Sequence, residues 1–186
     1  MMKRVLNKMY SKRKGIEDIF NTFPNYMKFI LLILIVILLI SFIHIKVLLA
    51  TDFKTNKYIK SWRIGEGESF TIEYIHSVEL TPVLEIYIIE DDKIILTESY
   101  FKSYGAGLPS TTPYKFEITD KGFRIYDINQ VMEDIVYRTG AERANHRLIF
   151  RDKEYVFLDF TKPRSGVKFN VKKISILTYI VKEVIK

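Results

Sequence analysis

The sequence predicts a mostly-β protein, in which one N-terminal transmembrane helix precedes an antiparallel β-sandwich or barrel-like domain with a candidate C-terminal helix. Residues 29–45 contain no Asp, Glu, Lys or Arg, and a membrane-spanning helix needs about 20 mostly apolar residues. Further on, about seven or eight short strand-like segments alternate with turn residues, a pattern typical of antiparallel sandwiches and barrels. The chain of 186 residues has room for one such domain.

The membrane helix is expected at residues 29–50, if the apolar run continues past Lys46 to Ala50. A buried core helix is the alternative, but a domain of this size cannot cover a helix that is apolar on every side. A cleaved signal peptide would need small residues before its cut site, and Leu48 stands two positions before Ala50. The sequence therefore favours a retained signal anchor over a cleaved signal peptide.

The positive charge predicts the orientation of this anchor. Residues 1–28 carry seven Lys or Arg and two acidic residues, so they are expected to form a cytoplasmic basic tail. The protein is then a single-pass protein of the cell membrane. Residues 51–64 are interpreted as a stalk, and residues 65–186 as an extracytoplasmic β domain.

The composition excludes several classes of function. The chain has no cysteine, which excludes a disulfide framework, a thiolate nucleophile and a cysteine-based zinc site. Its net charge of +7 comes mostly from the tail, because residues 51–186 carry 21 basic and 20 acidic residues. No basic stripe interleaved with aromatic residues is visible there, so nucleic acid is not an expected partner.

Within the outer domain, alternating or β-branched apolar segments predict strands. These segments are residues 68–75, 83–90, 94–101, 114–119, 123–128, 147–150, 154–160 and 167–173. The turn at residues 120–122 ends in Gly122, which can adopt a left-handed backbone. The pattern at residues 130–137 is ambiguous, and a short helix is one interpretation of it. Residues 175–186 carry a helical apolar stripe, which indicates either a closing helix or a membrane contact too short to span.

Polar residues gather at the end of one predicted strand, in the stretch EYIHSVELTP at residues 73–82. His76 and Ser77 are neighbours on a strand and therefore point to opposite faces, so they form no nucleophile–base pair unless the chain bends. We expect Ser77 to be a turn hydroxyl that bonds the backbone.

A metal site would have to use His76, Glu79, Glu85 and His146, which do not occur at a recognised ligand spacing such as HExxH. No metal or other cofactor is therefore expected. His146 is interpreted as a surface residue that precedes a strand.

The second unusual stretch is SYFKSYGAGLPSTTP at residues 99–113. It is either a loop that turns a corner of the sheet, which we favour, or a loop whose amides meet an anionic or peptide ligand. Both stretches are expected at the open end of one hairpin and predict a shared binding site. The candidate residues are His76, Ser77, Glu79, Thr81, Pro82, Glu85, Glu98, Ser103, Tyr104, Gly105, Gly107 and Pro109.

The blocks YIHSVELTPVLEIY (residues 74–87) and ESYFKSYGAGLP (residues 98–109) resemble the domain-of-unknown-function family numbered 1850. The resemblance covers about residues 65–174. Members of that family have no established activity, and they are typically small exported or membrane-anchored bacterial proteins. They are often encoded beside TRAP-type solute transporters of the TAXI class. The resemblance therefore implies an accessory role in solute uptake, with a transporter permease or solute receptor as the partner.

The expected function is that of a membrane-anchored, extracytoplasmic binding or accessory protein for such a transporter. One alternative is a small extracytoplasmic hydrolase or metal-dependent enzyme that uses His76. The other alternative is a purely structural domain of the cell envelope. An enzyme is the less favoured of these interpretations, because no catalytic motif is complete.

Overall fold

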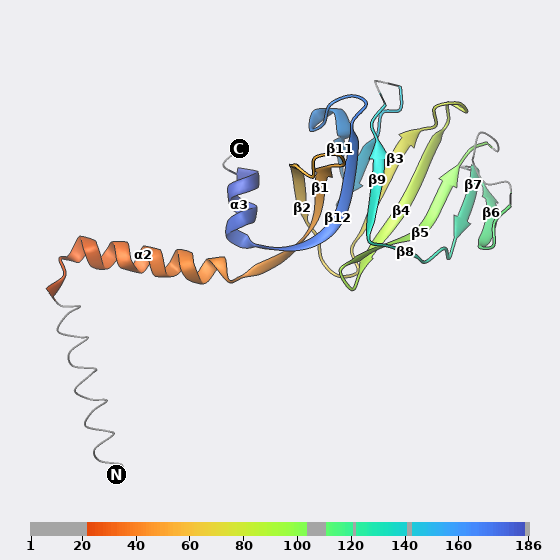
Figure 1. Cartoon of the computed structure of the whole chain (residues 1–186). Coiled ribbons are helices and arrows are strands. Elements are labelled where there is room, and N and C mark those ends of the chain that lie inside the picture. The colour runs from red at the N-terminus through yellow and green to blue at the C-terminus, as the bar shows by residue number, and fades with distance from the viewer. Residues whose placement is uncertain (1–21, 104–110, 121, 141–142, 185–186) are drawn as a thin grey trace, which may run out of the picture.

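The computed structural model describes residues 22–103, 111–120, 122–140 and 143–184 (Figure 1). Strands in these ranges form two antiparallel sheets. The first has the order β2-β1-β12-β9 and consists of β1 (His44–Asp52), β2 (Tyr58–Arg63), β9 (Asp134–Arg138) and β12 (Gly166–Ser175). The second has the order β11-β10-β3-β4-β5-β7-β6, and β8 also pairs with β5.

The strands of the second sheet are β3 (Ser69–Ile75), β4 (Pro82–Glu90), β5 (Lys93–Phe101), β6 (Lys115–Thr119), β7 (Gly122–Tyr126), β8 (Gln130–Met132), β10 (Arg147–Phe150) and β11 (Lys153–Val156). Both sheets contribute to one core, which includes Leu48, Phe70, Tyr87, Leu148 and Phe169. The 3-10 turn η1 (Phe157–Asp159) adds the fully buried ring of Phe157. The prediction of a mostly-β, antiparallel domain is confirmed.

The N-terminal boundary differs from the prediction, because the apolar run divides into a helix and a strand. Helix α2 spans Asn25–Ser41, and residues 44–50 belong to β1. Strand β1 pairs with β12 from His44–Ser175 to Asp52–Val167, and Val47, Leu48 and Ala50 are fully buried. The side chains of α2 are not buried. In the described part of the chain, no helix is both long and apolar enough to cross a membrane.

The predicted stalk at residues 51–64 is also wrong. These residues complete β1, turn, and return as β2, and Trp62 and Ile64 belong to the core. The Asp52 carboxylate accepts the backbone N–H of Thr55 at 2.8 Å, which stabilises the turn. The β domain therefore begins at His44, and only Phe42 and Ile43 separate it from α2.

The short helix considered for residues 130–137 is absent, because this segment forms β8 and β9. Strand β8 pairs with β5 of the second sheet, and β9 pairs with β12 of the first. The chain thus crosses between the sheets within a few residues. β-Branched side chains favour strands, and the side chain of Ile135 is buried in the core.

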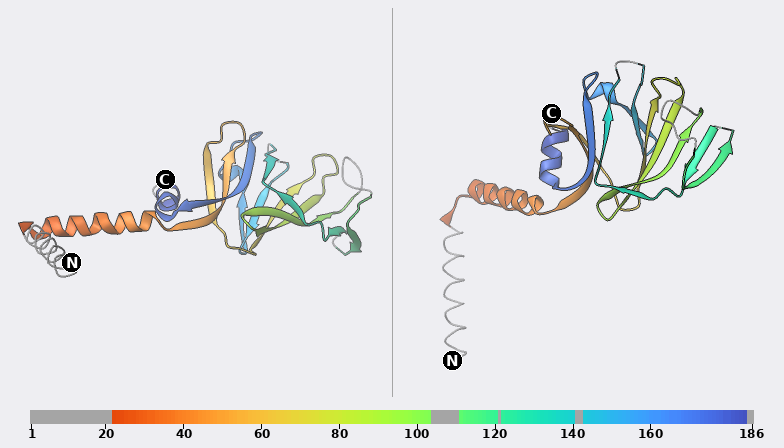
Figure 2. Two further views of the ribbon diagram at one scale, coloured as in Figure 1. Left: turned by 60° about the horizontal axis from the view of Figure 1, so that its bottom comes forward. Right: turned by 45° about the vertical axis from the view of Figure 1, so that its right-hand side comes forward.

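The predicted C-terminal helix is confirmed as α3 (Ile176–Val184). It contacts β2 and β12, and it also contacts α2. The Glu183 carboxylate accepts the backbone N–H of Ser61 at 2.8 Å, which supplies an acceptor to the edge strand β2. Figure 2 shows α2 extending away from the sheets, with α3 beside the point where α2 meets β1.

Candidate functional site

The predicted polar strand end is a tight loop between β3 and β4. The His76 N–H donates to the Thr81 carbonyl at 2.9 Å, and the Leu80 N–H donates to the His76 carbonyl at 3.0 Å. The His76 ring accepts the Glu79 N–H on Nδ1 at 3.2 Å, while Ser77 is exposed. In this loop, His76 stabilises the turn through hydrogen bonds of its backbone and its ring.

The two unusual stretches meet in space, as the hairpin geometry predicts. Thr81 stands directly before β4, which begins at Pro82, and its hydroxyl lies 3.4 Å from the hydroxyl of Ser103. The other candidates of the second stretch lie outside the described residues; they are Tyr104, Gly105, Gly107 and Pro109.

The two candidate carboxylates do not come together, because Glu85 and Glu98 occupy opposite faces of the second sheet. Glu98 lies on the outer face, where it accepts the Arg124 Nε–H at 2.8 Å and the Tyr100 hydroxyl at 2.9 Å. Arg124 lowers the pKa of Glu98. Glu85 pairs with Ser99 across the β4–β5 ladder and faces the other sheet. The expectation that both project into one site is therefore corrected.

On the inner face, Glu85 joins a cluster that bridges the two sheets. Its Oε2 accepts the hydroxyl of Tyr87 from the same strand at 3.3 Å. The same oxygen accepts the hydroxyl of Tyr137, which lies on β9 of the first sheet. The two tyrosine hydroxyls are 2.6 Å apart. These two hydrogen bonds, one from β4 and one from β9, fix the position of the Glu85 carboxylate.

Burial dominates the electrostatics of this cluster. It raises the pKa of Glu85, although the hydrogen bonds from Tyr137 and Tyr87 act in the opposite direction. Burial and the nearby Glu85 charge raise the pKa of Tyr74 to about 12. The same causes raise the pKa values of Tyr87 and Tyr137. The tyrosine hydroxyls therefore remain protonated donors at neutral pH.

His146 belongs to this cluster, and the expectation of a surface residue is wrong. Its ring stacks on Tyr74, with centroids 5.2 Å apart, and on Phe157 at 5.5 Å. The ring of Tyr137 meets it edge-on at 6.0 Å. Burial lowers the pKa of His146 to about 4, so the ring is neutral at physiological pH.

A cavity of about 390 Å³ borders this cluster. Glu85 and Tyr74 line it together with the apolar residues Val83, Leu96, Ile125 and Ile128. The other polar residues that line it are Ser99, Thr111, Thr112, Tyr114 and Gln130. In the described part of the chain, no group of three or more His, Asp or Glu side chains is placed to hold a metal ion. The cavity can therefore offer hydrogen bonds, one carboxylate and apolar surface to a small molecule.

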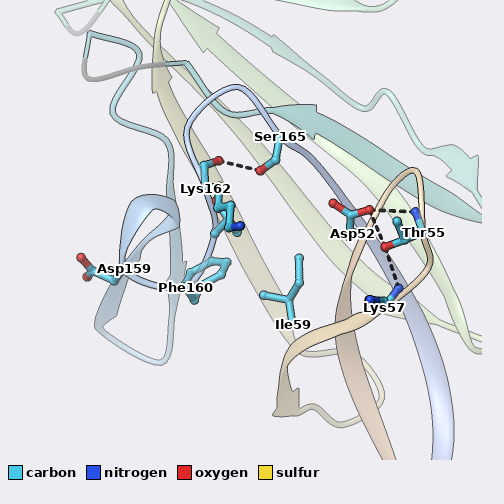
Figure 3. Close-up of a pocket in the computed structure, with 9 residues that line it drawn as sticks. Asp52, Thr55, Lys57, Ile59, Asp159, Phe160, Lys162 and Ser165 are labelled. Carbon is cyan, nitrogen blue, oxygen red and sulfur yellow. Dashed lines mark hydrogen bonds between the residues drawn. The ribbon is translucent and has the colours of Figure 1, made fainter.

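Two other hollows are less suited to a small ligand. One, of about 740 Å³, covers the outer face of the second sheet near Arg124, but that guanidinium already binds Glu98 and Glu117. The other, of about 460 Å³, lies between the β1–β2 turn and the segment after η1. Asp52 and Asp159 both line it, and Figure 3 shows Asp52 turned toward Thr55, to which it is hydrogen-bonded.

Sequence reasoning missed Tyr137 as a site residue and gave His146 the wrong surroundings. Tyr137 lies in the ambiguous segment at residues 130–137, so its place opposite Glu85 could not be inferred. A usable signal was the alternation of Ile135 and Tyr137, because both side chains of this strand face the core cluster. The stretch that holds Tyr74 and Glu85 was identified.

In a comparison with known proteins, the region that contains this cluster matches one protein family. The family model described as Domain of unknown function (DUF1850) matches residues 70–157, a range that contains Tyr74, Glu85, Tyr87, Tyr137 and His146. No curated protein and no solved structure matches the chain significantly. The match covers less than half of the chain, and residues 70–157, which carry the candidate site, are similar to that family.

Proposed function

We propose that the protein is a membrane-anchored, extracytoplasmic binding module that holds a small solute in the Glu85 cavity. One observation carries this proposal. The Glu85 carboxylate is fixed by hydroxyls from both sheets, and it borders a cavity of about 390 Å³. Such a volume is within the usual range of small-molecule pockets, about 300–1,000 Å³.

The chemistry of the cavity favours a solute with an amine or a similar hydrogen-bond donor. The two tyrosine hydroxyls bind Oε2 of Glu85. Among the described residues, no hydrogen bond reaches Oε1, so this oxygen is the acceptor offered to a ligand. The ring of Tyr74 also borders the cavity, and an aromatic face attracts a cation.

The membrane anchor is part of this proposal. Its support is the apolar sequence of α2, whose side chains are not buried against the β domain, and the basic excess in residues 1–28. A module confined to the membrane meets a membrane-bound partner at a raised effective concentration. The proposed partner is the permease or solute receptor of a TAXI-class TRAP transporter, for which the family resemblance is the only support.

The ligand is tested on the full chain in detergent, by calorimetric titration with amine-bearing solutes such as amino acids and polyamines. Wild type is compared with Glu85→Gln, which keeps the shape of the side chain and removes its charge. Glu98→Gln is the matched control on the opposite face of the same sheet. We expect wild type and the control to bind, and Glu85→Gln to bind about tenfold more weakly. The proposal fails if no solute binds, or if Glu85→Gln binds as well as wild type.

The partner is tested separately, by native purification of the tagged full chain from membranes. Transporter subunits recovered with wild type would support the accessory role. Their absence would remove the transporter from the proposal and would leave solute binding to the titration. The hydrolase alternative is less favoured, because Nδ1 of His76 accepts the Glu79 N–H and only Nε2 is left for a reaction.

A further inference from the structure

Helix α3 turns its polar side toward the β domain. The Glu183 carboxylate accepts the Ser61 N–H of β2 at 2.8 Å and also accepts the hydroxyl of Tyr58. The Lys182 ammonium lies over the Tyr58 ring, 4.4 Å from its centroid. Polar groups therefore hold the helix on the edge strand β2, whereas a helix on the surface of a domain ordinarily packs through its apolar side.

The apolar side of α3 points away from β2. Ile176, Leu177, Ile180 and Val181 share one side of the helix, because residues three and four positions apart are neighbours on its surface. Ile180 is 40% exposed and Val181 is 50% exposed, so the sheets leave this part of the apolar side uncovered. Exposed apolar surface of this kind marks a site of interaction.

This apolar side continues into α2. The two helices are in contact, and the Ile176 N–H donates to the Ile43 carbonyl at 2.8 Å. Phe42 and Ile43, which connect α2 to β1, are both exposed, and the side chains of α2 are not buried. One apolar surface therefore extends from α2 across the connection onto α3.

The directions of the two helices indicate what covers this surface. Helix α3 runs across the direction of α2, on the side of the β domain from which α2 departs (Figure 1, Figure 2). If α2 crosses a membrane, α3 therefore lies along the membrane surface, between the lipids and β2. An amphipathic helix in that position inserts its apolar side into the boundary between headgroups and acyl chains. Lys172, on the strand that leads into α3, and Lys182 are exposed, which favours anionic headgroups.

We propose that α3 is an interfacial helix, which inserts Ile180 and Val181 into the lipid surface while its polar side holds β2. This inference rests on the membrane anchoring of α2 in the proposed function. It adds a second contact with the bilayer, in a direction different from that of α2. Two such contacts fix how the β domain is turned relative to the membrane.

The test uses the absence of cysteine from the chain, which allows one label at a time. The full-length variants Ile180→Cys and Val181→Cys are labelled with the fluorophore NBD, whose emission shifts to the blue in lipid. They are reconstituted into vesicles of phosphatidylcholine and phosphatidylglycerol. Lipids that carry a nitroxide near the headgroup or deep in the acyl chain then quench any label that they contact.

Two further labels separate this inference from the anchoring itself. Ile35→Cys, in α2, reports whether that helix is in the bilayer. Ile118→Cys is the matched control, because Ile118 is an apolar side chain of β6 that is 75% exposed, at the end of the β domain far from α2 (Figure 1). The emission of Trp62, the single tryptophan, shows that each labelled variant is folded. If one α3 variant fails to fold, the other carries the test.

We expect the α3 labels to lose most of their emission to the shallow nitroxide and the label at residue 35 to the deep nitroxide, while the label at residue 118 keeps its emission. The inference is overturned, and the anchoring stands, if the label at residue 35 is quenched but the α3 labels are quenched no more than the control. Blue-shifted α3 labels that no nitroxide reaches would overturn it in favour of a protein contact, such as a second copy of the chain. If the label at residue 35 is not quenched either, the anchoring fails and this inference fails with it.

Discussion

His146 stacks on Tyr74, with ring centroids 5.2 Å apart and an angle of 18° between the planes. This contact and the neighbouring Phe157 ring bury the imidazole, which lowers its pKa from 6.5 to about 4. The folded protein therefore prefers neutral His146. Its contribution to stability is complete above pH 6.5 and is lost as the pH falls through 6.5 toward 4.

We expect His146→Phe to remove this pH dependence while it keeps the stacking. Between about pH 7 and pH 4.5, wild type should lose about 2 kcal/mol more unfolding free energy than the variant, after allowance for the partly exposed ring. Urea unfolding at both pH values measures the difference. Glu85, whose raised pKa acts in the opposite direction, is present in both proteins. Equal losses in both proteins would contradict this account.

Removal of the Tyr137 hydroxyl should destabilise the bridge between the sheets. Tyr137→Phe takes away one of two donors to the Glu85 carboxylate, and a buried acceptor that loses its partner costs about 1–3 kcal/mol. The pKa of Glu85 should also rise further, which an NMR titration of its carboxyl carbon would measure. Tyr126→Phe is the control, because Tyr126 makes ring contacts with Lys115 and Arg124 that phenylalanine retains. A change of similar size in the control would argue against a specific role for Tyr137.

Two glycines with positive φ give a matched test of backbone packing. Gly67 has φ +72° and open space where a Cβ atom would lie, whereas Gly122 has φ +118° and the Phe101 carbonyl oxygen only 2.6 Å from where its Cβ would lie. Gly67→Ala should cost about 1 kcal/mol for its backbone strain alone. Gly122→Ala adds a clash and should cost about 2–4 kcal/mol. Thermal unfolding of both variants measures the two losses of stability. Losses of similar size would refute the clash at Gly122.

Glu183 should hold α3 against the edge of the first sheet. Its carboxylate accepts the Ser61 N–H at 2.8 Å and the Ser61 hydroxyl at 3.1 Å. In Glu183→Ala the Ser61 amide loses its acceptor, so its hydrogen exchange should accelerate about tenfold or more. Lys182→Ala, which removes a contact over the Tyr58 ring, should leave the Ser61 amide protected. Exchange of Ser61 that stays slow in Glu183→Ala would show that α3 docks by other contacts.

The parts of the fold that depend on local signals could be predicted from the sequence. The β4–β5 hairpin is such a part, because Asp91 and Asp92 tolerate the positive φ values of 48° and 62° that its turn uses. Strand β1 could not be found in this way. Val47 and Leu48 point to opposite faces and are both fully buried, so the alternation that marks a strand disappears and the segment continues the apolar run of α2.

The candidate site, too, could be predicted only in part from the sequence. Glu85 stands in a polar stretch that attracts attention in the sequence, and the meeting of Thr81 with Ser103 follows from hairpin geometry. The donor Tyr137 comes from the other sheet, and its contact with Glu85 exists only because the two sheets pack together. Side-chain pairs across a core depend on that packing, which no local pattern specifies.

The short connection between α2 and β1 has a mechanical consequence. Only Phe42 and Ile43 lie between them, and β1 is bonded along its length to β12. Because the connection is so short, a change in the tilt of α2 would also change the orientation of the first sheet. In the proposed membrane-anchored state, this two-residue connection would hold the β domain close to the membrane surface, where a membrane-bound partner would meet it.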